Sequence, residues 1–222
     1  MRLSCVMFDL DGTLVDTAPD LMRCLNLALL QHGFAEASPA AIKPFISFGA
    51  RAMIAASLTA PADNRTEEAL LETMLDCYES HIADHSVFFA GIEDTLKLIE
   101  AQGLKWGVVT NKRKRFTNPL MAALNLTGRA ACIVSGDTTA FEKPHPEPML
   151  TACKLAGVEP EQCVYIGDAS HDIAAGKNAN MKTLAARYGY LKPGDRPETW
   201  GADAVIESPA QITDWIGAHT CH

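Results

Sequence analysis

The stretch Phe8-Asp9-Leu10-Asp11-Gly12-Thr13-Leu14-Val15 decides the fold, because an apolar segment breaks there into a turn with two acidic residues. Residues 5–8, Cys-Val-Met-Phe, are typical of a short buried strand. Side chains on a strand alternate, so we expect Asp9 and Asp11 to leave its end on the same side. A divalent cation, Mg2+, would hold two such carboxylates beside an incoming phosphate. This predicts a phosphoryl-transfer site; the alternative is a solvated acidic turn.

Two further segments carry groups that suit phosphate oxygens. Residues 104–109 read as a second buried strand, which ends in Thr110 and Asn111. Alone, such a pair is also typical of a turn or a helix cap. Lys143 lies in the proline-rich stretch 141–148, whose stiff backbone limits how far the lysine moves. The alternative is an ordinary exposed lysine.

A further apolar strand, the fourth segment of interest, is predicted over residues 163–166, and it runs into Gly167-Asp168. Asp172 follows near the start of a helix expected from Ser170 to Ala179, where an acid is often only a partner of the helix dipole. Because ligands bind at the carboxyl ends of parallel strands, we expect the polar groups of all four segments to share one pocket.

The alternation of strands and helices predicts an α/β fold with a doubly wound, Rossmann-like parallel sheet. Between residues 16 and 90 the pattern is helical. We therefore expect residues 1–15 and 91–222 to form a catalytic core, and residues 16–90 to form an all-helical cap inserted after the first strand. Crossings near 15–17 and 86–91 would act as hinges, so that the cap closes over a substrate and opens for release.

Composition excludes several classes of protein. The 222 residues carry a net charge of −8, which argues against nucleic-acid binding despite the basic run 112–115. No apolar stretch is long enough for a membrane span or resembles a signal peptide. Seven cysteines without a C-x-x-C pair do not suggest a disulfide framework. We expect a cytoplasmic protein, a monomer or a homodimer, whose partner is a small anionic phosphate ester.

Residues 8–17 resemble the first motif of the haloacid dehalogenase superfamily, in its phosphatase branch. The resemblance implies that Asp9 is a nucleophile that becomes an aspartyl-phosphate, and that Asp11 protonates the leaving oxygen and later activates water. The dehalogenases of the superfamily lack an aspartate at the second position, since halide leaves without a proton. Asp11 therefore indicates an oxygen leaving group.

The later segments resemble the second, third and fourth motifs of the same superfamily, and the resemblance extends over nearly the whole chain. It implies that Thr110 binds phosphate, with Gly12 and Asn111 contributing to substrate binding, and that Lys143 offsets negative charge around the nucleophile. The metal ligands would be Asp9, Asp11, Asp168 and Asp172, the last of these either as a direct ligand or as a residue that orients water and Lys143.

Within the superfamily the sequence looks most like the phosphoglycolate phosphatases, in residues 109–112, 143–146 and 188–190. It resembles the N-acetylmuramic acid 6-phosphate phosphatases at least as well in residues 48–53, 110–116, 186–190 and 200–203. Both substrates carry a carboxylate, and Arg51, which follows a flexible glycine, could clasp it with two hydrogen bonds; the alternative is a surface arginine. A phosphomutase, or a non-catalytic regulator on the same scaffold, remains an alternative function.

Overall fold

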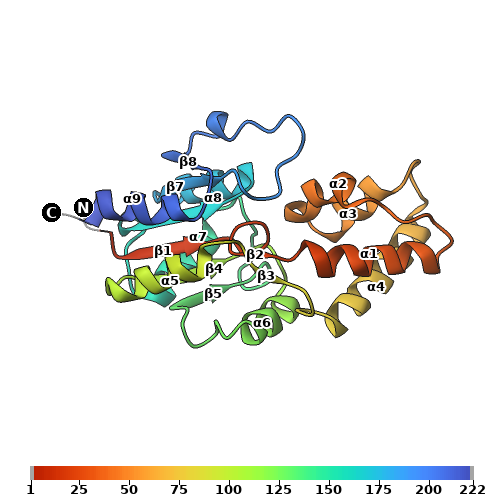
Figure 1. Ribbon diagram of the computed structural model, residues 1–222, viewed down its shortest axis with the longest axis horizontal. Helices are drawn as coiled ribbons and strands as arrows, with labels where there is room; N and C mark the ends of the chain where they lie inside the picture. Colours follow the sequence, from red (N-terminus) through yellow and green to blue (C-terminus); the bar gives the residue numbers. More distant parts are fainter. Residues whose placement is uncertain (1–2, 221–222) are drawn as a thin grey trace.

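The computed structural model describes residues 3–220 and contains a six-stranded parallel sheet with helices on both faces (Figure 1). The strand order is β5-β4-β1-β6-β7-β8, and each neighbouring pair is parallel. The strands are β1 (Cys5–Phe8), β4 (Lys105–Val109), β5 (Cys132–Val134), β6 (Cys163–Gly167), β7 (Lys182–Ala186) and β8 (Ala204–Ile206). The predicted doubly wound fold is therefore confirmed.

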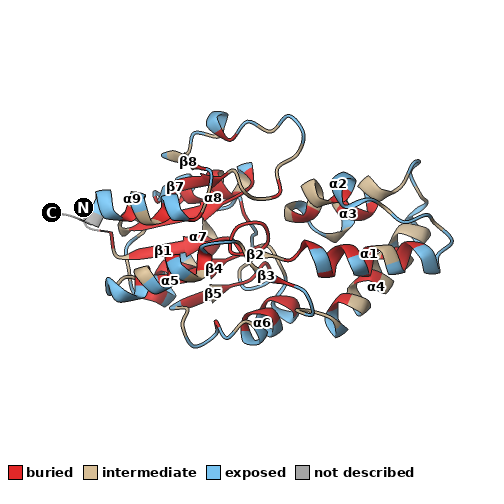
Figure 2. Ribbon diagram, viewed as in Figure 1, coloured by how far each residue is buried: buried red, intermediate tan, exposed pale blue. Residues whose placement is uncertain are grey.

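The central strand β1 is buried on both faces, which explains its uninterrupted apolar sequence (Figure 2). Val6 and Phe8 pack in one hydrophobic cluster with residues of α5, α6 and α9, whereas Cys5 and Met7 pack in another with residues of α7 and α8. These helices are α5 (Ile92–Ala101), α6 (Lys114–Ala123), α7 (Glu147–Ala156), α8 (Ser170–Asn178) and α9 (Ala210–Thr220), joined by two short 3-10 turns, η2 (Pro160–Gln162) and η3 (Pro197–Thr199). Alternate side chains of β1 thus pack against the helices on opposite faces of the sheet.

A second group of helices lies beside the sheet and has a hydrophobic cluster of its own (Figure 1). It comprises α1 (Ala18–Gln31), α2 (Pro39–Ile42), the 3-10 helix η1 (Lys43–Phe48), α3 (Ala50–Ser57) and α4 (Asn64–Ser80). The long helices α1 and α4 pack along each other with buried leucines and methionines between them. We call this group, residues 18–80, the helical insertion.

The edges of the helical insertion differ from the predicted all-helical range 16–90. Two short strands, β2 (Val15–Asp16) and β3 (Val87–Phe88), pair antiparallel where the chain enters and leaves the insertion. Strands of two residues are too short to show an alternating pattern, so they could not be predicted from the sequence. The entry and exit segments therefore lie side by side.

A buried carboxylate also joins these two segments. Asp20, in the first turn of α1, is fully buried and accepts hydrogen bonds from the backbone N–H groups of His85 (3.0 Å) and Ser86 (2.8 Å) and from the Ser86 hydroxyl (2.6 Å). On the core side, the Tyr190 hydroxyl donates to Asp16 (2.6 Å). The junction is thus held by charge-assisted hydrogen bonds.

Helix α6 differs from the sequence expectation at its start. A proline inside a helical pattern indicates either a weaker helix or one that begins late, but α6 begins at Lys114 and continues through Pro119. Pro119 removes one backbone N–H, and the burial of Phe116, Leu120 and Met121 on one helix face compensates for it. Within residues 3–220, no helix combines the length and the apolar character that a bilayer crossing requires.

Candidate active site

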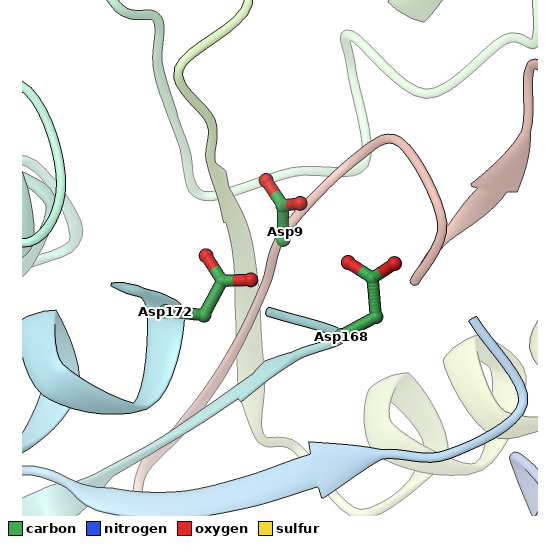
Figure 3. A group of neighbouring side chains, drawn as sticks. All are labelled: Asp9, Asp168 and Asp172. Atoms are coloured by element: carbon green, nitrogen blue, oxygen red, sulfur yellow. The ribbon is translucent and has the colours of Figure 1, made fainter. Parts of the chain in front are cut away.

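Three buried carboxylates converge at the carboxyl end of the sheet (Figure 3). Asp9 follows β1, Asp168 follows β6, and Asp172 lies in the first turn of α8. One oxygen of each lies within 4.8 Å of the others, and none of the three residues is more than 4% exposed. The sequence predicted that these strand ends would meet, and the neighbouring positions of β1 and β6 bring them together.

Two glycines allow the carboxylates to come this close. A Cβ at Gly12, which has a φ of +87°, would lie 2.2 Å from an Asp168 carboxylate oxygen, and a Cβ at Gly167 would lie 2.3 Å from the Cβ of Asp172. Such distances are far below van der Waals contact, so no side chain fits at either position. Gly12, which was predicted as a substrate-binding residue, thus lies against the carboxylate of Asp168.

Lys143 places a buried positive charge between two of the carboxylates. Its Nζ donates hydrogen bonds to Asp9 Oδ1 and Asp172 Oδ1, both at 2.7 Å, and lies 2.9 Å from the Tyr165 hydroxyl and 3.1 Å from the Val109 carbonyl. Burial disfavours its charge, but the two carboxylates outweigh burial and raise the pKa of Lys143 to about 12. The lysine is therefore an ammonium at neutral pH.

The carboxylates themselves resist ionisation in different degrees. Burial raises the pKa of Asp9 to about 7; Lys143 opposes this shift, and the charge of Asp172 adds to it. Burial, together with the charges of Asp9 and Asp172, holds the pKa of Asp168 well above its usual range, although the Tyr190 amide donates to it at 2.7 Å. Like charges thus accumulate beyond what one lysine compensates.

The pKa of Asp172 is shifted the other way. Burial would raise it, but the ammonium of Lys143 outweighs burial and lowers the pKa below its usual value. A site with one firmly ionised carboxylate and two that need further positive charge fits a small divalent cation. Because all its donors are hard carboxylate oxygens, the group suits a hard divalent cation of the class to which Mg2+ belongs.

The carboxylate of Asp11 lies apart from this group of three. It accepts hydrogen bonds from Lys112 Nζ at 2.9 Å and from the Thr17 hydroxyl at 2.5 Å. Asp11 is thus not one of the three grouped carboxylates, although it lines the same cavity as Asp9, and its assignment as a metal ligand stays a prediction. The strand ends before Asp9, and the positive φ of Gly12 turns the chain, so the alternation of a strand no longer applies.

A cavity of about 610 Å³ lies between the sheet and the helical insertion. The core residues that line it are Asp9, Asp11, Thr110, Asn111, Lys112, Arg113, Arg115, Phe116, Glu142, Lys143 and His171. The insertion contributes Leu21, Ile46, Ser47, Phe48, Gly49, Ala50, Arg51, Met53, Leu71, Leu75 and Tyr78. The core side is thus charged, and the insertion side is mainly apolar.

Residues 6–186 match the profile of the haloacid dehalogenase-like hydrolase family. The chain belongs to this family. It is 41% identical, over 100% of its length and 98% of the relative's, to the N-acetylmuramic acid 6-phosphate phosphatase of Pseudomonas aeruginosa. It is 40% identical to the phosphoglycolate phosphatase of Xanthomonas campestris, over 93% of each chain. A crystal structure of a predicted phosphoglycolate phosphatase from Haemophilus somnus superimposes with a TM-score of 0.87 at 25% identity, covering 97% of this chain and 98% of that one.

The resemblance drawn from the sequence motifs is thereby confirmed, and the relatives are phosphoric monoester hydrolases, as the motifs predicted. The other predicted residues of this haloacid dehalogenase-like hydrolase lie as follows. Thr110 is nearly buried at the cavity wall. Asn111 exchanges two hydrogen bonds with the backbone of Lys143, at 3.0 and 3.1 Å, and so holds the lysine loop. Arg51 lines the cavity, but its guanidinium pairs with Glu68 at 2.7 Å.

Sequence reasoning missed three residues at this site. Lys112, considered only as a source of charge, pairs directly with the predicted acid Asp11. Tyr78 of the insertion lies over Lys112, with the ammonium 4.5 Å from the ring centroid. Tyr190 donates its backbone N–H to Asp168 and its hydroxyl hydrogen to Asp16. Tyr78 lies among the apolar positions of α4, so its burial could have been predicted from the sequence. Nothing in the sequence indicated that it would contact Lys112.

Proposed function

We propose that this hydrolase is a Mg2+-dependent phosphatase that hydrolyses a small-molecule phosphate monoester through an aspartyl-phosphate at Asp9. The observation that carries the proposal is the position of Asp9. Its carboxylate lies at the wall of the cavity, 2.7 Å from the buried Lys143 ammonium and beside two further carboxylates that suit a cation. A carboxylate in this setting can be ionised and aimed at phosphorus.

In this mechanism an oxygen of Asp9 forms a bond to phosphorus while the bond from phosphorus to the ester oxygen breaks. Asp11 gives its proton to the departing oxygen, then takes one from the water that attacks the phosphoenzyme, and the Asp9 carboxylate is regenerated with inorganic phosphate. Thr110 and Lys143 contact the phosphate oxygens. Asp9, Asp168 and Asp172 would hold Mg2+, which when bound screens the negative charges of phosphate and carboxylates.

The helical insertion would serve as a cap, closing over the substrate about the β2–β3 junction and excluding water. The paired strands and the Asp20 hydrogen bonds support this proposal, because they join both crossings at one point. We further propose that the enzyme acts in the cytoplasm, in keeping with the free cysteines among the described residues.

For the substrate, the sequence favoured phosphoglycolate, and the cavity favours a larger ester. A volume of about 610 Å³ with an apolar insertion side exceeds what a two-carbon acid phosphate fills. N-acetylmuramic acid 6-phosphate has a sugar ring, an acetamido methyl and a lactyl group to occupy it, and is the substrate named for the relative matched over the whole chain. Phosphoglycolate is the second candidate, supported by the 40% identical relative.

The test is release of inorganic phosphate from both esters by the purified chain, with and without Mg2+. We expect Mg2+-dependent release and a kcat/KM for N-acetylmuramic acid 6-phosphate at least about tenfold above that for phosphoglycolate. The reverse preference would favour the second candidate. If neither ester nor 4-nitrophenyl phosphate is hydrolysed, the proposal is wrong.

A further inference from the structure

One buried polar group at the cavity carries a proton without an acceptor. Tyr78, in α4 of the insertion, is 1% exposed, and its hydroxyl makes no hydrogen bond of ordinary geometry among residues 3–220. The Lys112 ammonium beside it interacts with the hydroxyl but can only donate to it. The residue lines the cavity. Buried hydroxyl groups are nearly always hydrogen-bonded, so an orphan at a cavity wall points to a group that the cavity receives.

A second donor lies next to this hydroxyl. Lys112 is nearly buried, with 8% of its side chain exposed, and its ammonium lies 4.5 Å from the Tyr78 ring centroid. Burial disfavours its charge, but the nearby Asp11 carboxylate outweighs burial and raises the pKa of Lys112 above its usual value. An ammonium has three N–H groups, and one of them serves Asp11 at 2.9 Å.

Tyr78 is also a donor at neutral pH, because burial raises the pKa of its hydroxyl to about 12, against the opposing charge of Lys112. Two donors together call for an acceptor. Three arginines, Arg51, Arg113 and Arg115, line the same cavity, although the protein as a whole is acidic. This concentration of positive charge favours an anionic acceptor over a neutral one.

The phosphate group of the substrate does not account for these donors, since the proposed function places it against Asp9 and Lys143. Arg51, the residue that the sequence suggested for a second anion, is 63% exposed and already pairs with Glu68. Tyr78 and Lys112 are by contrast buried and close to Asp11, the proposed acid. They lie on the side where the alcohol portion of the ester must be held.

We propose that the Tyr78 hydroxyl and the Lys112 ammonium form a subsite that binds the carboxylate of the substrate's alcohol portion and so determines specificity. The proposal rests on the proposed function of the cavity. Because Tyr78 comes from the insertion and Lys112 from the core, the subsite is complete only when the two are packed together. A substrate that lacks the carboxylate loses the contact.

The test compares binding of two esters that differ only in the lactyl group, N-acetylmuramic acid 6-phosphate and N-acetylglucosamine 6-phosphate. Dissociation constants are measured by calorimetry with Mg2+, in an Asp9→Asn background that cannot form the phosphoenzyme, with and without Tyr78→Phe. We expect Tyr78→Phe to weaken binding of the lactyl ester about tenfold and to change that of the other ester less than twofold. Equal changes for both esters, or no change, would overturn the subsite.

Two controls make the result specific. Tyr188→Phe removes a hydroxyl that donates to the Thr13 carbonyl at 3.1 Å, and it should not alter the ratio of the two constants. The melting temperature of Tyr78→Phe should equal or exceed that of the parent, because an unpaired hydroxyl is removed; a clear fall would assign the hydroxyl a structural role and count against the subsite. Hydrolysis by the wild-type chain is measured separately. Its absence would refute the proposed function, while the binding ratio would still decide the subsite.

Discussion

The two sides of the cavity are built on opposite principles. On the core side, the buried Lys143 ammonium lies 2.7 Å from a carboxylate oxygen of Asp9 and 2.7 Å from one of Asp172. On the insertion side, the wall is mainly apolar, and the hydroxyl of its buried Tyr78 makes no hydrogen bond of ordinary geometry among the described residues. The core side thus holds its charges in fixed positions before any substrate arrives, and two of its carboxylates still need a cation. On the insertion side, the proton of the Tyr78 hydroxyl gains an acceptor only from a ligand.

This difference indicates which side of the cavity serves the chemical step and which side serves recognition of the substrate. Charged groups fixed by one another need little rearrangement during a reaction, which is the property that stabilises a transition state. A mainly apolar wall with few polar groups contributes little to the chemical step, but it discriminates between ligands that do or do not match it. Changes at Asp9 or Lys143 should therefore reduce the rate for every ester. Changes on the insertion side should alter which ester has the highest kcat/KM.

The largest effect is expected from Asp9→Asn, which removes the nucleophile on the core side. The rate of phosphate release should fall by a factor of at least about 10⁴ for all esters. The measurement is hydrolysis of 4-nitrophenyl phosphate with Mg2+, with circular dichroism to verify that the variant folds. Activity that survives the change would contradict the assignment of Asp9.

Lys143→Met should reduce both activity and stability. It leaves the Asp9 and Asp172 carboxylates buried without their counter-ion, which costs about 3–5 kcal/mol, and kcat should fall about 10²- to 10³-fold. Denaturant unfolding and steady-state kinetics measure the two effects. Lys97→Met is the matched control, since this lysine is 62% exposed and its nearest carboxylate is 3.7 Å away; its effect should be close to zero.

The response to Mg2+ should depend on pH. Asp9 has a pKa raised to about 7 in the folded chain, so without a cation its contribution to stability is greatest below the unfolded value near 4 and is lost as the pH rises through about 7. Binding a cation requires the ionised form. At pH 8, Mg2+ at a hundred times its Kd should stabilise the fold by about 2.7 kcal/mol. The same concentration at pH 5 should add less than about 0.5 kcal/mol. Calorimetric melting at both pH values measures this, and an equal shift at both would argue against carboxylate ligands.

Asp20→Asn tests the junction between the two sides. The amide would turn an N–H group toward the donors of His85 and Ser86, and the hinge hydrogen bonds would weaken. We expect kcat/KM to fall about tenfold for all esters, because the proposed closure of the insertion would become less favourable. Asp84→Asn, at an exposed carboxylate near the same segment, is the control. If the loss is confined to one ester, the effect is on recognition and not on closure.

The smallest effects are expected at Arg51. If this arginine binds a substrate carboxylate, it must leave Glu68, so the two anions compete for it. Glu68→Gln should then lower the KM of the lactyl ester about two- to threefold, and Arg51→Met should raise it by a similar factor, as expected for an exposed ion pair. Kinetics of both variants with the two amino sugar esters would show this. A KM unchanged in both would leave Arg51 as a surface residue.

The sequence was most informative where function depends on local order along the chain. The strand before Asp9 and the later strands ending at Thr110 and Asp168 show their periodicity directly, and a parallel sheet brings such ends together. The contacts of the Asp11 carboxylate with Lys112 and Thr17 were not predictable, because they depend on the turn at Gly12, where the strand has already ended.

Contacts between the insertion and the core were beyond sequence reasoning for another reason. The ammonium of Lys112 meets a ring 34 positions earlier only because α4 packs beside α6, and no spacing rule encodes such packing. The same holds for the bond from the Ser47 hydroxyl to Asp168, at 3.0 Å, which spans 121 positions. Periodicity predicts which face of a helix is buried, but not its partner.

The β2–β3 pair suggests how the two halves could be separated by design. In its register Asp16 stands directly opposite Val87, so the 70 residues between them begin and end at neighbouring points. A tight hairpin loop of about two residues could bridge that gap in their place. The helical insertion is therefore a candidate for exchange. In a chimaera, the insertion of a related protein would be joined at Asp16 and Val87, and the six-stranded sheet with its carboxylates would stay unchanged.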